Sequence, residues 1–140
     1  MTTGVVTKDA VTREWALKLV QDVEDAFGRA DVGWIMRGYT DDVVIRFADL
    51  PEIRGKAAAE RFLRARFARQ RNYRLRKVLR MLEGNMLGNF WDGSWEDTKT
   101  GKKMLGRGTE FWTIRGGKIV LWEATFNVWE DGGAAQTPIV

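Results

Sequence analysis

The feature that most constrains the fold is the segment Arg115-Gly116-Gly117-Lys118, which lies between two long strand-like segments. Two consecutive glycines at such a place predict a two-residue β-hairpin turn, because glycine readily adopts the positive φ angles that the turn requires. We therefore expect Met104–Ile114 and Ile119–Trp129 to pair as antiparallel strands. Two further strand-like segments precede them, Tyr73–Leu82 and Met86–Glu96, so the second half of the chain predicts a meander of four long strands.

Three helical segments come before this meander. From about Asp9 to Phe27, apolar residues recur at every third or fourth position, which predicts an amphipathic helix. Asp31 is expected to cap a short second helix, and Lys56–Arg71 predicts a third, with a first short strand at Asp42–Phe47 between them. Helices followed by a strand meander are typical of an α+β fold in which a sheet wraps over helices.

The size of the chain indicates one globular domain. Its 140 residues, 44% of them hydrophobic, suffice for a core without covalent cross-links. We expect a single domain over residues 1–140, with an ordered core at about 9–129 and a flexible, Gly- and Pro-containing tail at 131–140. Residues 1–6 lack a signal-peptide pattern and no apolar run is long enough to span a membrane, so we expect a cytoplasmic protein with no membrane partner.

The absence of two residue types narrows the chemistry. The chain has no cysteine, which excludes disulfides and cysteine nucleophiles. It also has no histidine, which removes the commonest general base and most zinc or non-haem iron sites. We therefore expect no metal and no cofactor, and any catalysis must rely on carboxylates, Tyr, Lys, Arg or ordered water.

A two-residue turn would also fix the register of the last hairpin. Counting outward from the turn places Glu110 directly opposite Glu123. The same face would carry four further residues: Trp112, Leu121, Thr125 and Asn127. Cβ atoms of directly opposed residues lie roughly 4.5–5.5 Å apart, so one carboxyl group would keep its proton or meet a cation. A protonated carboxyl group in an apolar pocket can stabilise an oxyanion, which makes Glu110 and Glu123 the candidate catalytic residues.

Two alternatives to this carboxylate pair stay open. Both acids can lie solvated at an open rim or be neutralised by an arginine, and a β-bulge would shift the register and separate them. The opposite face of the hairpin is apolar and needs a partner. Three of its residues, Val120, Trp122 and Phe126, therefore predict a homodimer formed through the sheet.

The order of several short motifs resembles the nuclear-transport-factor-2-like superfamily. These motifs are Ala30-Asp31-Val32, Tyr39-Thr40-Asp41-Asp42-Val43 and Arg54-Gly55-Lys56, followed by the strand meander. Gly108-Thr109-Glu110-Phe111-Trp112 and Glu123-Ala124-Thr125-Phe126-Asn127 resemble its SnoaL-like branch. The resemblance covers about residues 12–129. It implies a cone-shaped fold in which three N-terminal helices pack in a curved mixed or antiparallel sheet around a central pocket.

The catalytic sets known in that superfamily do not carry over intact. Glu110 falls close to the protonated oxyanion-hole acid of ketosteroid isomerases, but Phe47 and Val23 fall near the positions of their base and tyrosine. Scytalone dehydratase requires histidines, and the Arg-x-Asp strand of limonene-epoxide hydrolase appears here only as Arg107-Gly108-Thr109. The resemblance therefore implies a fold and a pocket rather than a particular reaction.

The remaining pocket candidates are aromatic and basic side chains. Besides Trp112, Thr125 and Asn127, they are Trp15, Arg46, Phe62, Arg66 and Trp91. Aromatic residues at such spacings are equally explained as core. Arg66 lies on the apolar arc of the third helix. There it can either bind an anionic group or extend along the helix end towards solvent.

The basic segment between residues 54 and 80 holds 11 basic residues and one acidic residue. It invites a nucleic-acid interpretation, but a solvated helix face and an edge strand protected by charge explain it more simply. The leading hypothesis is a protein that binds a small hydrophobic or amphipathic molecule, with cofactor-independent lyase, isomerase, cyclase or hydrolase chemistry carried by carboxylates. The alternatives are a non-catalytic binding or dimeric assembly module and, third, a nucleic-acid binder through residues 61–80.

Overall fold

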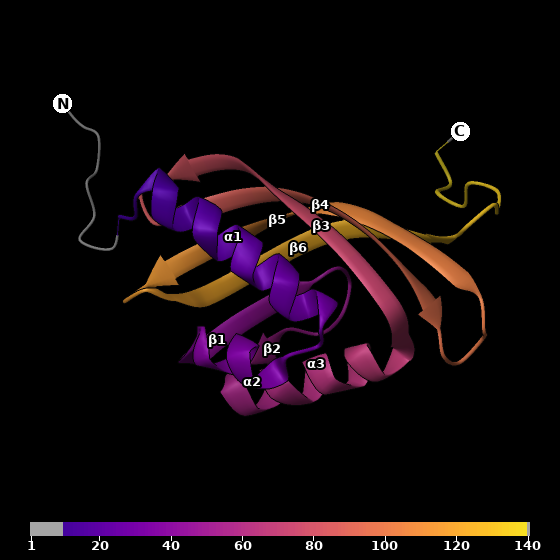
Figure 1. The fold of residues 1–140 in the computed structure, drawn as a ribbon, viewed down its shortest axis with the longest axis horizontal. Coiled ribbons are helices and arrows are strands. Elements are labelled where there is room, and N and C mark those ends of the chain that lie inside the picture. The colour runs from indigo at the N-terminus through magenta and orange to yellow at the C-terminus, as the bar shows by residue number, and fades with distance from the viewer. Residues whose placement is uncertain (1–9, 140) are drawn as a thin grey trace.

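The computed structural model describes residues 10–139 and has the expected α+β architecture (Figure 1). Its helices are α1 (Arg13–Gly28), α2 (Val32–Arg37) and α3 (Lys56–Arg69). Its strands are β1 (Tyr39–Phe47), β2 (Ile53–Arg54), β3 (Gln70–Glu83), β4 (Met86–Asp97), β5 (Lys103–Arg115) and β6 (Lys118–Glu130). They form one curved sheet in the order β2-β1-β6-β5-β4-β3. The sheet is mixed, because β1 and β6 are parallel and all other neighbours are antiparallel.

The helices begin where polar side chains satisfy their first backbone N–H groups. Thr12 accepts a hydrogen bond from the N–H of Trp15, so α1 begins at Arg13, later than the expected start. Asp9, where the helix was expected to begin, lies outside the described residues. Asp31 caps α2 as expected, accepting from the N–H of Trp34 at 3.0 Å. The short strand β2 is the one element that the sequence pattern does not predict.

Aromatic side chains join the helices to one face of the sheet, here called the inner face. The ring of Phe27 on α1 lies 6.0 Å from Trp122 on β6 and 5.4 Å from Phe67 on α3. Phe47 on β1 packs at 5.1 Å from Phe62 on α3. These edge-to-face contacts fix α1 and α3 over the sheet and enclose the interior of the cone.

The register of the β5–β6 hairpin differs from the prediction. The expected turn forms, and the residues on its two sides pair, but Val120 is an extra residue in β6. This β-bulge lets Trp112 pair with Trp122, so both indole rings lie on the inner face. A regular ladder would have placed them on opposite faces. Burying both rings is the physical reason for the bulge.

The bulge separates the two glutamates that the regular register had paired. Glu110 lies opposite Ala124, and Glu123 lies opposite Phe111. Glu110 faces the interior, whereas Glu123 faces the uncovered side of the sheet, here called the outer face, and accepts a hydrogen bond from Arg46 at 3.2 Å. The prediction of an opposed carboxylate pair is therefore wrong.

The same shift corrects the expected dimer surface. Trp122 is only 3% exposed and packs against Phe27 and Phe47, and Phe126 also packs against Phe47. Trp122 and Phe126 therefore belong to the inner face and do not form an exposed apolar surface with Val120.

The C-terminal segment lies beyond the last strand. Residues 131–139 contain no helix or strand, and Thr137 accepts a hydrogen bond from the side chain of Asn127 at 2.8 Å. Among residues 10–139, none of the helices has the length and apolar character needed to cross a bilayer.

Candidate functional site

A small cavity lies on the inner face between α1, α2 and the sheet. Its walls are Leu19, Val23, Phe27, Trp34, Ile35, Gly38, Tyr39, Lys77, Glu110, Trp112, Ile119 and Trp122. Most of these side chains are apolar, and Lys77 and Glu110 bring the only formal charges to the wall. The free space is about 20 Å³, and one water molecule needs roughly 10–15 Å³ by the same measure. The cavity is therefore narrow unless side chains along its wall move.

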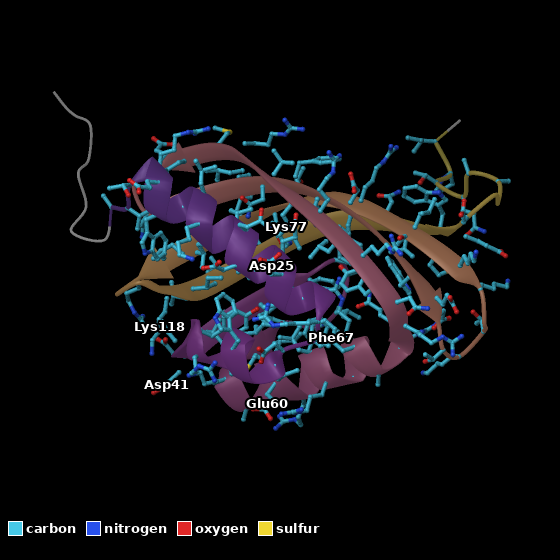
Figure 2. The ribbon with its side chains drawn as sticks, in the orientation of Figure 1. Asp25, Asp41, Glu60, Phe67, Lys77 and Lys118 are labelled. Carbon is cyan, nitrogen blue, oxygen red and sulfur yellow. The ribbon has the colours of Figure 1, made fainter. Side chains whose placement is uncertain are left out.

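The polar centre of this cavity is an ion pair between two buried side chains. The Nζ of Lys77 lies 2.7 Å from Oε2 of Glu110, and the two side chains are 4% and 1% exposed. Such burial is costly for either charge alone, so each one depends on the other. Figure 2 labels Lys77 where β3 passes α1, inside the curve of the sheet.

The Glu110 carboxylate has two further donors. Asn89 lies directly opposite Glu110 on β4 and donates from Nδ2 to Oε2 at 3.1 Å. The indole N–H of Trp122 donates to Oε1 at 3.0 Å. The single oxygen of the Asn89 amide, Oδ1, is buried and has no hydrogen-bond donor among residues 10–139. The carboxylate is therefore held in place from β3, β4 and β6 together.

The alternation of β3 explains why a lysine is found here. Tyr73, Leu75, Lys77 and Leu79 share the inner face, whereas Arg74 and Arg76 point outward. The backbone N–H of Lys77 donates to Glu24 on α1 at 2.7 Å, which attaches this edge strand to the helix above it. Lys77 thus occupies a position where an apolar residue would be expected.

Burial changes the acidity of two groups that line the cavity. Desolvation lowers the pKa of Lys77 from its usual value, against the attraction of Glu110, which raises it. Burial raises the pKa of the Tyr39 hydroxyl, and the negative charge of Glu110 raises it further. The tyrosine is therefore neutral at physiological pH, and the lysine gives up its proton more readily than an exposed one.

Three aromatic rings surround the Lys77 ammonium. Its Nζ lies 5.8 Å from the ring centroids of Phe27 and Trp91 and 5.6 Å from that of Trp112. An ammonium has three N–H donors, and the contact to Glu110 uses one of them. The remaining donors face aromatic rings, which attract a cation but replace a hydrogen-bond acceptor poorly.

Arg66 on α3 forms a second cationic point in the interior. Its guanidinium carbon lies 4.9 Å from the ring centroid of Phe47 and 5.8 Å from those of Phe27 and Tyr73. Its one hydrogen bond to a side chain among the described residues runs to the Tyr73 hydroxyl, at 3.3 Å. The Phe27 ring thus lies near both cations, because its centroid is also 5.8 Å from Lys77 Nζ.

The structure brings together only some of the predicted site residues. Inward-facing or packed against the core are Trp15, Phe62, Arg66, Trp91, Glu110 and Trp112. Outward-facing are Arg46, Glu123, Thr125 and Asn127. Of the residues predicted for the pocket, only Glu110 and Trp112 line the cavity, and Trp122, predicted for a dimer interface, lines it too. Thr125 instead lies beside Thr109, with their hydroxyl oxygens 3.3 Å apart.

Lys77, Asn89 and Tyr39 are the site residues that sequence reasoning missed. The sequence pattern places Lys77 in the basic segment, Asn89 in a strand and Tyr39 in a motif of the superfamily, and it assigns none of them to a site. The signal for Lys77 was nevertheless present, because it falls in phase with Tyr73 and Leu75 rather than with the arginines. A lysine in phase with apolar residues on a strand indicates a buried charge, which needs a partner.

A curved open sheet with helices on its inner face, around an apolar cavity with a few polar groups, defines a nuclear-transport-factor-2-like protein of the cone type. A family profile described as the SnoaL-like domain matches residues 20–122. This chain therefore belongs to the SnoaL-like family. Among curated proteins, none matches the sequence significantly.

Solved structures share the fold. A candidate polyketide cyclase from Xanthomonas campestris pv. campestris is 26% identical, with a TM-score of 0.73 over 82% of this chain and 92% of its own. An NTF2-like protein of unknown function from Burkholderia pseudomallei is 17% identical, with a TM-score of 0.71 over 81% and 91%. An LEH-like epoxide hydrolase from M. tuberculosis is 16% identical, with a TM-score of 0.65 over 81% and 84%. The similarity to the last two concerns the fold alone.

Proposed function

We propose that this protein binds a small hydrophobic or amphipathic molecule in the inner cavity and presents the Lys77 ammonium to an oxygen atom of that ligand. The observation that carries the proposal is the buried contact between Lys77 and Glu110, whose side chains are 4% and 1% exposed. Solved structures that share this fold include a candidate polyketide cyclase and an LEH-like epoxide hydrolase, and both names denote enzymes that act on small molecules.

The arrangement suits proton transfer at a carbonyl compound. The Lys77 ammonium lines the cavity and has only one hydrogen-bond acceptor among the described residues, Glu110, and burial lowers its pKa. A ligand carbonyl oxygen beside Nζ would receive a hydrogen bond, which acidifies the neighbouring C–H group. Glu110 holds the amine in place and is itself fixed by Asn89 and Trp122. The C–H proton then passes to a water molecule, and the enolate oxygen that forms stays hydrogen-bonded to the Lys77 ammonium. An isomerase, a lyase or a cyclase can each begin with such an enolate.

Entry to the cavity requires side-chain movement, because the free space is about 20 Å³. Leu19 on α1 and Trp34 on α2 are half-buried wall residues and therefore the simplest ones to move. A bulky residue at position 19 should consequently block the ligand without altering the polar centre.

Binding is tested with 2-naphthamide, a neutral aromatic probe with a carbonyl group, by isothermal titration calorimetry. We expect wild-type protein to bind it and Leu19→Trp to lose binding. The matched control is Leu17→Trp on the same helix, because Leu17 is 46% exposed and lies off the cavity. Equal binding by both variants, or no binding by wild-type protein, would contradict the proposal.

The chemistry is tested with 2-acetonaphthone in deuterium oxide, following exchange of its methyl protons by NMR. We expect faster exchange with wild-type protein than with Lys77→Met. General acid–base assistance typically contributes about 10²–10⁴-fold to such steps. Binding without accelerated exchange would identify a binding protein rather than an enzyme.

A second copy of the chain is the partner we propose for the outer face, which none of the described helices α1, α2 and α3 covers (Figure 1). Met81 and Phe111 are 62% and 45% exposed and lie on either side of Gly88, and Met86 is 41% exposed on the same face. Sedimentation at micromolar concentration should report a dimer in wild-type protein and a weaker one in Phe111→Lys. A monomer at these concentrations would contradict this arrangement.

A further inference from the structure

Arg66 differs from every other arginine of the chain in where its side chain lies. The other arginines are exposed, whereas Arg66 is half-buried on the side of α3 that faces the interior. Figure 2 shows the neighbouring Phe67 on the side of α3 towards α1, with Glu60 on the far side. The side chain therefore belongs to the interior, although α3 offers solvent on its other side.

No carboxylate in the described part of the chain forms an ion pair with Arg66. Glu110 is already bound by Lys77, Asn89 and Trp122. Glu24 on α1 accepts from the backbone N–H of Lys77 and the amide of Gln21. Arg66 is stabilised instead by the faces of Phe27, Phe47 and Tyr73, which attract a cation but do not neutralise it.

A half-buried cation without an anion is an unusual state for a protein interior, because charges removed from water are normally paired. The guanidinium is also poorly used as a hydrogen-bond donor. It has five N–H groups, and its one hydrogen bond to a side chain among residues 10–139 runs to the Tyr73 hydroxyl at 3.3 Å. The partner that would fit the Arg66 guanidinium is therefore an anion with several acceptor oxygens, bound among the aromatic rings.

From this geometry we infer that the ligand is an anion, and that Arg66 binds its carboxylate or a similar group. The inference rests on the proposed small-molecule function and adds the substrate class: an aromatic or otherwise apolar molecule that carries one carboxylate. Arg66 lies beyond the cavity wall, but Phe27 is part of that wall, and its ring centroid lies 5.8 Å from both the Arg66 guanidinium carbon and Lys77 Nζ. The apolar part of the ligand therefore lies against Phe27 and reaches Arg66 when the side chains of the wall move. The carboxylate is bound on the α3 side, and the rest of the molecule extends towards Lys77.

The guanidinium group is well suited to this task. Its planar fork pairs with the two oxygens of a carboxylate, and it stacks on aromatic rings more readily than an ammonium does. Phe62 and Phe126 pack around Phe47 beneath it, which keeps that part of the interior apolar. Low polarity around the cation strengthens its attraction for an anion.

The test compares 2-naphthoate with 2-naphthamide, which have the same shape but differ in charge. Charge-assisted hydrogen bonds make us expect wild-type protein to bind the carboxylate about ten- to hundredfold more tightly. In Arg66→Met this preference should disappear, while the affinity for 2-naphthamide stays within about twofold. Arg66→Lys should keep part of the preference, because it retains the charge but not the fork.

The matched control is Arg61→Met, which removes a positive charge from an exposed position of α3 that forms no ion pair in the described structure. Arg61→Met should prefer 2-naphthoate over 2-naphthamide by the same factor as wild-type protein does. Equal affinity of wild-type protein for both probes overturns the inference even if no Arg66 variant folds. A preference that survives Arg66→Met, or is lost in Arg61→Met, overturns it as well. If neither probe binds, the small-molecule function fails first.

Discussion

At the scale of single residues, the Lys77–Glu110 pair dominates the interior. The pair is buried, and its carboxylate accepts hydrogen bonds from Asn89 and Trp122 in addition to the lysine. A buried ion pair adds little net stability over an apolar pair, but removing one member leaves an unpaired charge out of water. Its presence therefore points to a role other than stability.

We predict that Lys77→Met lowers the free energy of unfolding by about 3–5 kcal/mol, because the Glu110 carboxylate loses its cation. The double variant Lys77→Met with Glu110→Gln should recover most of this loss, since the amide still accepts from Trp122 and carries no charge. Urea denaturation measures both. The control Arg76→Met breaks a pair with Asp92 in which the two side chains are 68% and 44% exposed, and it should leave the urea midpoint almost unchanged. Similar losses for positions 76 and 77 would contradict the prediction.

At the scale of elements, the middle of β5 is shaped by a close approach of two backbones. A Cβ atom at Gly108 would lie 2.5 Å from Cβ of Phe126 and 2.8 Å from its Cα, and closer still to the carbonyl oxygen of Thr125. Only glycine lets β5 and β6 pair at this point. The close pairing brings Phe126 against Phe47 and Trp91 on the inner face.

We predict that Gly108→Ala destabilises the protein by roughly 1–3 kcal/mol or more, because the new methyl group collides with backbone atoms that cannot move separately. Gly28 is the control, since a Cβ there meets nothing within 4 Å. Gly28→Ala should leave stability unchanged or raise it by less than about 1 kcal/mol. Thermal unfolding followed by circular dichroism compares the two. A tolerated Gly108→Ala would show that the strands can separate at this point.

The turn between β4 and β5 is tied to the end of α3 by Asp97. This carboxylate is 4% exposed and accepts from Nε of Arg69 at 2.7 Å and from the hydroxyl of Thr100 at 2.9 Å. The hydrogen bonds from Arg69 are the main reason that the pKa of Asp97 lies well below its usual range. α3 and the sheet are therefore coupled through one ionised group.

The pKa of Asp97 is lower in the folded protein than in the unfolded chain, where it is near 3.8. The ionised carboxylate therefore stabilises the fold fully above this unfolded value, and the stabilisation is lost as the pH falls from there through the folded pKa. We predict that the urea midpoint of wild-type protein falls more steeply below pH about 4 than that of Asp97→Asn. The control Asp92→Asn removes the more exposed pair with Arg76, and its urea midpoint should fall with pH as steeply as that of wild-type protein. Parallel curves for wild-type protein and Asp97→Asn would exclude this coupling.

At the scale of the whole molecule, the basic segment is less basic than the sequence suggests. Several of its arginines pair with acids that are distant or on the next helical turn: Arg64 with Glu60, Arg69 with Asp97, Arg71 with Glu96 and Arg76 with Asp92. Arg66 and Lys77 are turned inward. The segment thus presents an interleaved surface of both signs rather than a positive stripe.

We predict that a fluorescently labelled, mixed-sequence oligonucleotide shows no saturable binding at physiological ionic strength, because few phosphate contacts remain available. Fluorescence anisotropy at low and physiological salt measures this. Saturable binding with a steep salt dependence would restore the nucleic-acid hypothesis, and its loss in Arg74→Glu would locate it on β3.

The elements of this fold are predictable because their signals are local. Apolar residues at every third or fourth position define α1 and α3, polar residues cap α1 and α2, and alternation defines the four long strands. The Gly-Gly turn also forms as predicted. Each of these preferences acts between residues that are close in the chain, so it can be recognised from the sequence without knowledge of the fold.

The register of the last hairpin and the partners of the buried charges depend instead on residues that are far apart in the chain. Val120 bulges because Trp112 and Trp122 must both reach one core, which is built by helices and by β1, outside the hairpin. Lys77 meets Glu110 only through a sheet that brings residues 33 positions apart to 2.7 Å. The sequence by itself determined the helices, the strands other than β2, and the turn. Tertiary packing decided which side chains face the cavity, because burial is a property of the assembled layers and not of any one segment.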